Sequence, residues 1–285
     1  MKIVKEIEAL KSVLNHVRGT FPSIGLVPTM GALHQGHLAL IRAAKSQSDY
    51  VVVSIFVNPI QFNQVKDFEN YPNTLEFDLE LLKKEMVDLV FIPSTKEIYP
   101  KQVGLSLSFP NFDNMLEGKF RPGHFNGVGI VVAKLLHLVQ PDLAFFGQKD
   151  LQQAYVINLL VEGLSFGVKI VVVPTVREED GLAFSSRNLR LGLAERKIAP
   201  KLYETLSLAK KRLLHKKTWQ EVKRTLTKEL EGIDSLKLEY FELVRLPDFV
   251  IVQHCAADAE FALCIAAHLG DIRLIDNEII GFHPE

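Results

Sequence analysis

Strand-like and helix-like segments alternate along the first 176 residues, and this order constrains the fold more than any other feature of the sequence. Short apolar runs typical of buried strands are separated by longer segments whose apolar residues have helical spacing. We expect strands at 24–28, 50–57, 87–92, 143–146 and 168–173, and helices at 37–48, 75–86, 127–139 and 149–162. The run at 50–57 is too apolar for a sheet with one face in water. The order therefore predicts an α/β fold built on a doubly wound parallel sheet.

The pattern changes after Val176. The stretch 194–231 is expected to be helical and is rich in lysine and arginine, and short strands are expected at 240–244, 250–252 and 262–268. Leucines at helical spacing interrupt the basic residues, which favours a solvated amphipathic face over a nucleic-acid contact. The sequence therefore predicts two domains, 1–176 and a smaller α+β domain at 177–285.

Composition excludes several classes of protein. With 285 residues, 47% of them hydrophobic, the chain can bury a full core and is not a disordered protein. A net charge of −1 gives no support to bulk nucleic-acid binding. Cys255 and Cys264 stand nine residues apart, which excludes a CxxC zinc site and a disulfide scaffold. The apolar stretch 128–139 is too short to span a membrane, and with no signal-peptide core near Met1 we expect a cytoplasmic protein.

The segment 28–37 (PTMGALHQGH) follows the first strand-like run and opens a helix. Gly31 permits a sharp turn, and Gly36 allows the backbone to approach a ligand closely. The helix start offers unpaired N–H groups and a positive dipole end, which both suit a phosphate. His34 and His37 can lie on one side of the helix and stabilise charge on a leaving pyrophosphate. A zinc half-site, two surface histidines or a helix start without a ligand are the alternatives, although no cysteine or glutamate completes an HExxH motif.

Two more segments carry groups suited to a nucleotide. In FGQKDLQQ (146–153), Gly147 allows close approach, Lys149 can neutralise a phosphate and Asp150 can accept from ribose hydroxyls. DGLAFSSRN (180–188) offers two hydroxyls and a guanidinium after a mobile turn, between the domains, where a closing lid would belong. A solvated helix start and a polar interdomain loop are the alternatives for these two segments.

Two segments suit a small polar substrate. Asn58 and Gln61 end the central strand with two amides, which can bind hydroxyls and a carboxylate without titrating. Arg121 is a natural partner for a carboxylate or phosphate. Ordinary turns around Pro59 and Pro122 are the alternative interpretation.

These motifs, in this order, resemble the pantothenate synthetase family within the HxGH nucleotidyltransferases. The resemblance runs almost end to end and includes SIFVNPIQF, YPNTLEFD, FRPGHFNGV and the closing LGDIRLIDN. It implies a Rossmann-like domain at 1–176 that binds ATP and pantoate, and a smaller domain at 177–285 that closes over the ATP site. It also implies a homodimer that takes ATP, pantoate and β-alanine as substrates, with Mg²⁺ bound through the phosphates of ATP and with no nucleic acid or membrane as partner.

The resemblance also assigns site residues, with His37 regarded as the proton donor. The implied catalytic residues are His37, His34 and Lys149. The implied ATP-binding residues are Met30, His34, His37, Gly147, Gln148, Lys149, Asp150, Val176, Phe184, Ser185, Ser186 and Arg187. The implied substrate-binding residues are Gln61, Gln153, Asn58 and Arg121, and Tyr71, Asp78 and His124 match other positions of the family's cleft. Asn73 and Phe184 depart from the arginine and methionine common in the family, which could change a contact at the cleft rim and the packing of adenine.

The implied reaction has two steps. The carboxylate of pantoate attacks the α-phosphorus of ATP to give pantoyl adenylate and pyrophosphate, and the amine of β-alanine then displaces AMP. The first step needs no general base because a carboxylate is already ionised at neutral pH. His37, a water or the departing AMP phosphate could each deprotonate β-alanine. Another HxGH nucleotidyltransferase, acting on a small acid or a phosphorylated acceptor, and a non-catalytic nucleotide-binding module remain as alternatives.

Overall fold

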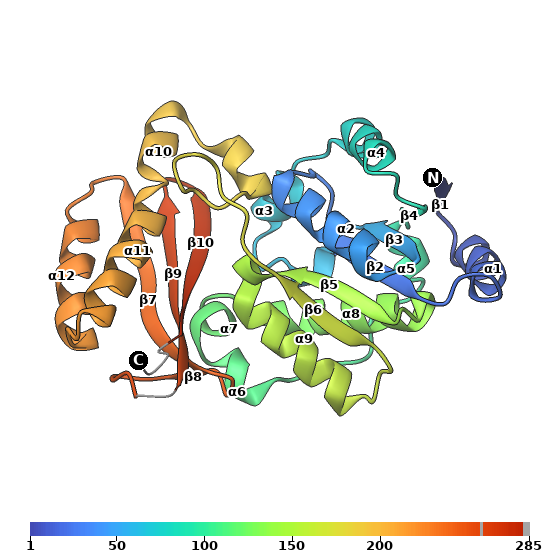
Figure 1. Cartoon of the computed structure of the whole chain (residues 1–285). Coiled ribbons are helices and arrows are strands. Elements are labelled where there is room, and N and C mark those ends of the chain that lie inside the picture. Colours follow the sequence, from blue (N-terminus) through green and yellow to red (C-terminus); the bar gives the residue numbers. More distant parts are fainter. Residues whose placement is uncertain (257–258, 282–285) are drawn as a thin grey trace. The chain divides into compact units, whose positions relative to one another are not determined.

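The computed structural model describes residues 1–256 and 259–281 and divides into two compact units, Met1–Pro174 and Thr175–Glu285 (Figure 1). The first unit carries a parallel sheet and the second an antiparallel one. This confirms the predicted fold class, a Rossmann-like doubly wound sheet followed by a smaller α+β part. The sequence prediction had placed the division after Val176.

The sheet of unit 1 has six strands in the order β1-β4-β3-β2-β5-β6. The strands are β1 (Lys2–Val4), β2 (Ile24–Thr29), β3 (Tyr50–Ile55), β4 (Leu89–Phe91), β5 (Leu143–Gly147) and β6 (Lys169–Val173). From β2 the chain adds β3 and β4 on one side and β5 and β6 on the other, so the order reverses between β2 and β5. The register pairs Gly25 with Leu143 and Leu26 with Ala144 only, and pairing therefore stops before either strand ends. Open α/β sheets bind ligands outside the carboxyl ends of the strands at such a reversal.

Helices cover both faces of this sheet. The helices of unit 1 are α1 (Ile7–Arg18), α2 (Gln35–Gln47), η1 (Pro59–Gln61), α3 (Val65–Glu69), α4 (Leu75–Lys84), α5 (Thr95–Ile98), α6 (Pro110–Asp113), α7 (Leu116–Phe120), α8 (His124–Val139), η2 (Gln148–Asp150) and α9 (Leu151–Gly163). Ile41 of α2 and Leu82 of α4 share a core with Val27 and Val53. The alternate residues Leu26 and Val52 are also fully buried, and α8 and α9 pack against β2, β5 and β6. Burial on both sides explains why these strands are continuous apolar runs.

Unit 2 is a four-stranded antiparallel sheet packed against helices. Its strands, in the order β10-β9-β7-β8, are β7 (Leu236–Leu246), β8 (Val250–Ile251), β9 (Glu260–Leu269) and β10 (Ile272–Gly281). Its helices are η3 (Ser186–Arg190), α10 (Leu193–Ile198), α11 (Lys201–Leu214) and α12 (Trp219–Glu231). Trp219 packs edge-on against Phe241 with ring centroids 5.0 Å apart, at the centre of the core.

The stretch 194–231 is helical as predicted, and the structure divides it into α10, α11 and α12. Pro200 stands at the start of α11, where its missing N–H costs no helical hydrogen bond. Thr218 starts α12 with its hydroxyl accepting from the Glu221 N–H at 3.3 Å. The sequence analysis also missed α1, β10 and β1, the last a three-residue edge strand with one buried side chain.

Candidate active site

The turn between β2 and α2 is the first part of the site. Gly31 has φ +80° and Ala32 has φ +49°, so two successive residues adopt the left-handed conformation. Glycine adopts this conformation freely, whereas for alanine it costs free energy that the surrounding structure must supply. The turn ends at His34, which is the N-cap of α2.

Asp78 of α4 holds this turn from behind. Its carboxylate accepts the Ala32 N–H at 2.9 Å and the Leu33 N–H at 2.8 Å, and the Thr74 hydroxyl at 3.1 Å. The side chain is only 1% exposed. The resemblance implied that Asp78 lines the ligand cleft, and in the structure its carboxylate is instead bound to the backbone of the turn.

The rings of His34 and His37 lie face to face, with centroids 4.0 Å apart and planes inclined by 35°. The backbone N–H of His34 donates to Nδ1 of His37 at 3.3 Å, so the neutral His37 ring carries its proton on Nε2. Desolvation, with smaller contributions from His37 and Lys149, lowers the pKa of His34 from 6.5 to about 2. Desolvation also lowers the pKa of His37 to about 4, with Asp150 opposing the shift and Lys149 adding to it. Both imidazoles are therefore neutral hydrogen-bond donors at pH 7.

The turn after β5 brings the second motif to the same edge of the sheet. η2 places Lys149 and Asp150 close enough to the histidines to shift their pKa values. Gly147 has φ −82°, so no backbone constraint requires glycine there, and a Cβ would have no heavy atom within 4 Å. That open space leaves the backbone accessible to a ligand. Gln148 lies beside it, at the start of η2.

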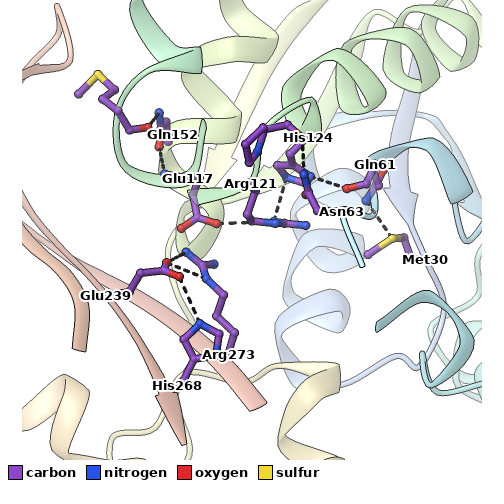
Figure 2. Close-up of polar contacts among 12 residues, drawn as sticks. Met30, Gln61, Asn63, Glu117, Arg121, His124, Gln152, Glu239, His268 and Arg273 are labelled. Atoms are coloured by element: carbon purple, nitrogen blue, oxygen red, sulfur yellow. Dashed lines mark hydrogen bonds and ion pairs between the residues drawn. The ribbon is translucent and has the colours of Figure 1, made fainter. Parts of the chain in front are cut away.

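Asn58 and Gln61 lie in the short segment that follows β3. The Asn58 Nδ2 donates to Oε1 of Gln61 at 3.0 Å. The Gln61 Nε2 donates to Sδ of Met30 at 3.1 Å (Figure 2). Both amides are buried. The predicted substrate-binding Gln61 is thus in direct contact with Met30, which belongs to the predicted ATP-binding turn.

Helix α8 makes an unusually close contact with this segment. A Cβ on Gly127 would lie 2.4 Å from the carbonyl oxygen of Ile60 and 2.7 Å from the backbone nitrogen of Gln61. Such distances are possible only for glycine, and the sequence analysis did not single out this residue. The only signal in the sequence was a glycine at the start of the helix predicted at 127–139.

The side chains at the start of α8 hold Gln61 from its other side. The Nδ1 of His124 lies 2.9 Å from the Gln61 carbonyl oxygen, and its Nε2 lies 3.0 Å from Nη1 of Arg121 (Figure 2). Because a carbonyl only accepts and a guanidinium only donates, the His124 proton sits on Nδ1. Arg121 also lies 3.5 Å from the Glu117 carboxylate. Arg121, predicted to bind substrate, therefore already contacts two side chains of unit 1.

The two neighbouring glutamines of α9 have different environments. Gln152 is 4% exposed and accepts from the Glu117 N–H at 2.9 Å (Figure 2). It donates to the carbonyls of Phe112 and Met115 at 3.1 and 3.0 Å. Its side chain therefore fastens the chain between α6 and α7 to α9. Gln153, the predicted substrate ligand, is partly exposed.

The remaining predicted ATP-binding residues belong to unit 2. Val176 accepts from the Phe184 N–H at 3.1 Å, and the Ser185 hydroxyl accepts from the Arg187 N–H at 3.3 Å to start η3. Ser186 is buried. These residues therefore form one compact segment of unit 2.

Arg177 contacts the turn before this segment, which the sequence analysis predicts to be mobile. Arg177 forms an isolated bridge with Ala183 and donates to Oδ2 of Asp276 at 2.6 Å and to the Gly181 carbonyl at 3.2 Å. Its guanidinium also lies 3.7 Å from the centre of the Tyr203 ring. The segment predicted to bind ATP is thus tied to the sheet and helices of unit 2.

None of the helices in 1–256 and 259–281 is long and apolar enough to cross a membrane. Across the same ranges, no cluster of three or more His, Cys, Asp or Glu side chains could hold a metal ion.

Comparison with known proteins gives a consistent result. Residues 2–279 match the model of the pantoate-beta-alanine ligase family. A pantothenate synthetase from Leptospira biflexa serovar Patoc is 44% identical over 286 residues, which is 98% of this chain and 99% of the relative. The crystal structure of pantothenate synthetase from Thermus thermophilus superposes with a TM-score of 0.90 at 39% identity, covering 98% of this chain and 99% of that one. Pantoate-beta-alanine ligase from Francisella tularensis, complexed with beta-gamma ATP and beta-alanine, gives 0.80 at 37% identity, covering 98% and 97%.

Proposed function

The chain belongs to the pantoate–β-alanine ligase family, and on this premise we propose that it joins pantoate to β-alanine in an ATP-dependent reaction through pantoyl adenylate. One observation supports placing the reaction here: the turns that follow β2 and β5 lie together where the strand order of the sheet reverses. The turn after β2 brings His34 and His37, and the turn after β5 brings Lys149. The ligand crevice of this fold class lies at the same place.

The phosphates of ATP would bind at the start of α2. There the N–H groups of the helix and the neutral Nε2–H of His37 can donate, and Lys149 adds a positive charge. A polyphosphate beside the rings would favour their protonated forms, which opposes the desolvation that keeps them neutral. We therefore assign His34, His37 and Lys149 to the stabilisation of charge on the departing pyrophosphate. Met30, Gly147, Gln148 and Asp150 would complete the ATP site of unit 1.

Pantoate would lie against the amides. We assign Gln61 and Gln153, with Arg121 beside them, to the hydroxyl and carboxylate groups of this substrate, and Asn58 to the support of Gln61. Its carboxylate oxygen attacks the α-phosphorus, and the bond from that phosphorus to the bridging oxygen of pyrophosphate breaks. The ammonium group of β-alanine loses a proton to His37, to water or to the phosphate of AMP, its nitrogen attacks the activated carbonyl, and the carbon–oxygen bond to AMP breaks. These side chains act by holding the reactants in line, since a carboxylate nucleophile needs no deprotonation.

Mg²⁺ would enter with ATP. The described part of the chain has no carboxylate cluster for it, and Mg²⁺ usually keeps several waters and binds through substrate phosphates with few protein ligands. The ion would neutralise phosphate charge. We propose that the ATP complexed with magnesium is the substrate, which is tested by measuring the rate at increasing Mg²⁺ with ATP held constant.

We propose three further properties. Unit 2 would move as one body to bring Val176, Phe184, Ser185, Ser186 and Arg187 to ATP, because its loop is anchored to its own sheet. The protein would act as a homodimer, for which the edge strand β6 offers backbone groups to a second chain. It would work in the cytoplasm, where ATP is available and two unbridged cysteines remain reduced. Sedimentation measures the oligomeric state, and scattering with and without ATP measures closure.

The assay for the proposed reaction is AMP release from ATP, with pantoate and β-alanine omitted in turn. AMP should form only when both acids are present. A nucleotidyl group retained on the acceptor would point instead to another nucleotidyltransferase, and ATP binding without AMP would point to a non-catalytic module.

The assigned roles are tested with His37→Ala and Lys149→Ala. Each should slow pyrophosphate formation more than ~100-fold, the low end for the loss of preorganised charge stabilisation. His16→Ala, an exposed histidine of α1, is the matched control and should behave as wild type. A near wild-type rate in either site variant would remove that residue from the mechanism.

A further inference from the structure

A hydrogen-bonded chain runs from Tyr99 through Asn58 to Gln61 inside unit 1. The Tyr99 hydroxyl donates to Oδ1 of Asn58 at 2.9 Å. The Asn58 Nδ2 donates to the Gly127 carbonyl at 3.1 Å and to Oε1 of Gln61 at 3.0 Å. Asn58 is 1% exposed, so water cannot replace a lost partner without a rearrangement.

The partners fix the direction of both amides. The Gly127 carbonyl can only accept, so Asn58 must turn its NH₂ group toward it and its oxygen toward Tyr99. The Asn58 nitrogen then meets Oε1 of Gln61, and the Gln61 NH₂ group points away from Asn58. One of its protons reaches the Sδ of Met30 at 3.1 Å, and a thioether is a weak acceptor. Gln61 therefore faces the site with a donor.

We propose that Tyr99 is a positioning residue for the substrate acid, holding Asn58 so that Gln61 donates to, and does not accept from, an oxygen of pantoate. This inference rests on the proposed function, which places pantoate at Gln61. Neither the motifs nor the resemblance pointed to Tyr99, which follows α5 and lies 41 residues along the chain from Asn58.

The surroundings of Tyr99 suit this role. The centroids of the Tyr99 and Phe56 rings are 6.1 Å apart. The Lys134 ammonium lies 5.5 Å from the centroid of the Tyr99 ring. Burial raises the pKa of the Tyr99 hydroxyl well above its usual value, so the group stays a donor across the working pH range. Without that hydroxyl, the Asn58 oxygen would be buried and unpaired, so the amide would no longer be held as firmly in its present position.

The test is a double-mutant cycle on an enzyme whose wild-type activity has first been confirmed by AMP release. Tyr99→Phe should raise the KM for pantoate about fivefold to tenfold, the scale of one buried hydrogen bond, and leave the KM for ATP within twofold. In a Gln61→Ala background the same change should leave the KM for pantoate unaltered. Tyr50→Phe is the matched control, because Tyr50 is a buried tyrosine that begins β3 and therefore lies at the amino end of its strand, away from the amides.

The outcomes separate the two ideas. A wild-type chain that forms no AMP refutes the proposed function itself. If wild type is active, an unchanged KM for pantoate in Tyr99→Phe overturns the positioning role. An equal effect of Tyr99→Phe with and without Gln61 also overturns it, since that result describes a general structural contribution.

Discussion

Gly127 is the position at which a single added methyl group should separate catalysis from stability most clearly. In Gly127→Ala the new Cβ would lie 2.4 Å from the Ile60 carbonyl oxygen, whereas ordinary contacts begin at 3.4 Å. The obstructing atoms are backbone atoms of η1, so they cannot rotate away as a side chain would. The segment that carries Gln61 must therefore move by about 1 Å, the difference between these two distances.

The expected energies can be compared directly. Overpacking of this kind costs ~1–3 kcal/mol, while alanine in a helix interior is favoured over glycine by ~1 kcal/mol. The net loss of unfolding free energy should be at most about 2 kcal/mol, or a fall in Tm of roughly 4–8 °C for a unit of this size. A misplacement of ~1 Å in an active site can lower the rate by ~100-fold. Activity should therefore suffer much more than stability.

The assay is steady-state kinetics at varied pantoate and at varied ATP, with thermal unfolding of the same samples. Gly127→Ala should lower kcat/KM for pantoate by about 10- to 100-fold and change the KM for ATP little. Gly163→Ala is the control, because Gly163 ends α9 and a Cβ there meets no atom within 4 Å. A Gly127→Ala enzyme with wild-type kcat/KM for pantoate would refute the reasoning.

Side chains that hold the site should respond differently from those that face the substrate. Asp78→Asn should raise the KM for ATP about tenfold and lower the unfolding free energy by ~1–3 kcal/mol, because a backbone N–H of the turn loses its acceptor. Gln152→Ala should destabilise unit 1 by ~2–4 kcal/mol, whereas Gln153→Ala should raise the KM for pantoate without a loss of stability. As the pH falls from 6.5 to 4, the unfolding free energy of the wild type should decrease relative to that of His37→Gln by up to about 1.4 kcal/mol per pH unit.

The sign of the pH effect follows from the lowered pKa of His37. Above pH 6.5 the ring is neutral in both folded and unfolded chains, so the stability is fully present. Below 6.5 only the unfolded chain binds the proton, until the folded ring also titrates near pH 4. Denaturant unfolding at each pH measures the slope. Parallel curves of unfolding free energy against pH for wild type and His37→Gln would contradict the pH prediction. An unchanged KM for ATP in Asp78→Asn would contradict the role given to Asp78. Equal stabilities of Gln152→Ala and Gln153→Ala would contradict the distinction between the two glutamines.

The elements of unit 1 follow from local patterns more closely than those of unit 2. A run such as 50–57 is apolar at nearly every position, and the structure buries every residue of β3. By contrast, α11 and α12 share an amphipathic pattern, and their separation depends on a turn and on the cap at Thr218. Helical spacing continued through that turn, so the pattern alone could not mark it.

Some features of the site are local and others are not. His34 and His37 come together because three residues of one helix start separate them, and the sequence alone predicts this arrangement. The sequence does not predict that both rings are neutral, because their lowered pKa values arise from burial and from the charge of Lys149 on η2. Likewise Asp78 reaches the β2 turn from 46 residues away, and only the packing of α4 reveals that its carboxylate binds backbone.

The sequence by itself determined the fold class through its periodicity and indicated the family through the resemblance of its motifs, because both are written in residues that are neighbours along the chain. Only the tertiary structure decided which polar side chains hold the site and which face it. Gln152 and Gln153 are adjacent and chemically identical. In helix α9 the Gln152 side chain points toward buried hydrogen-bond partners, whereas Gln153 is partly exposed. Tyr99, Asn58 and Gly127 form one hydrogen-bonded group from three separate segments. Their relation depends on contacts between distant parts of the chain, which no local pattern records.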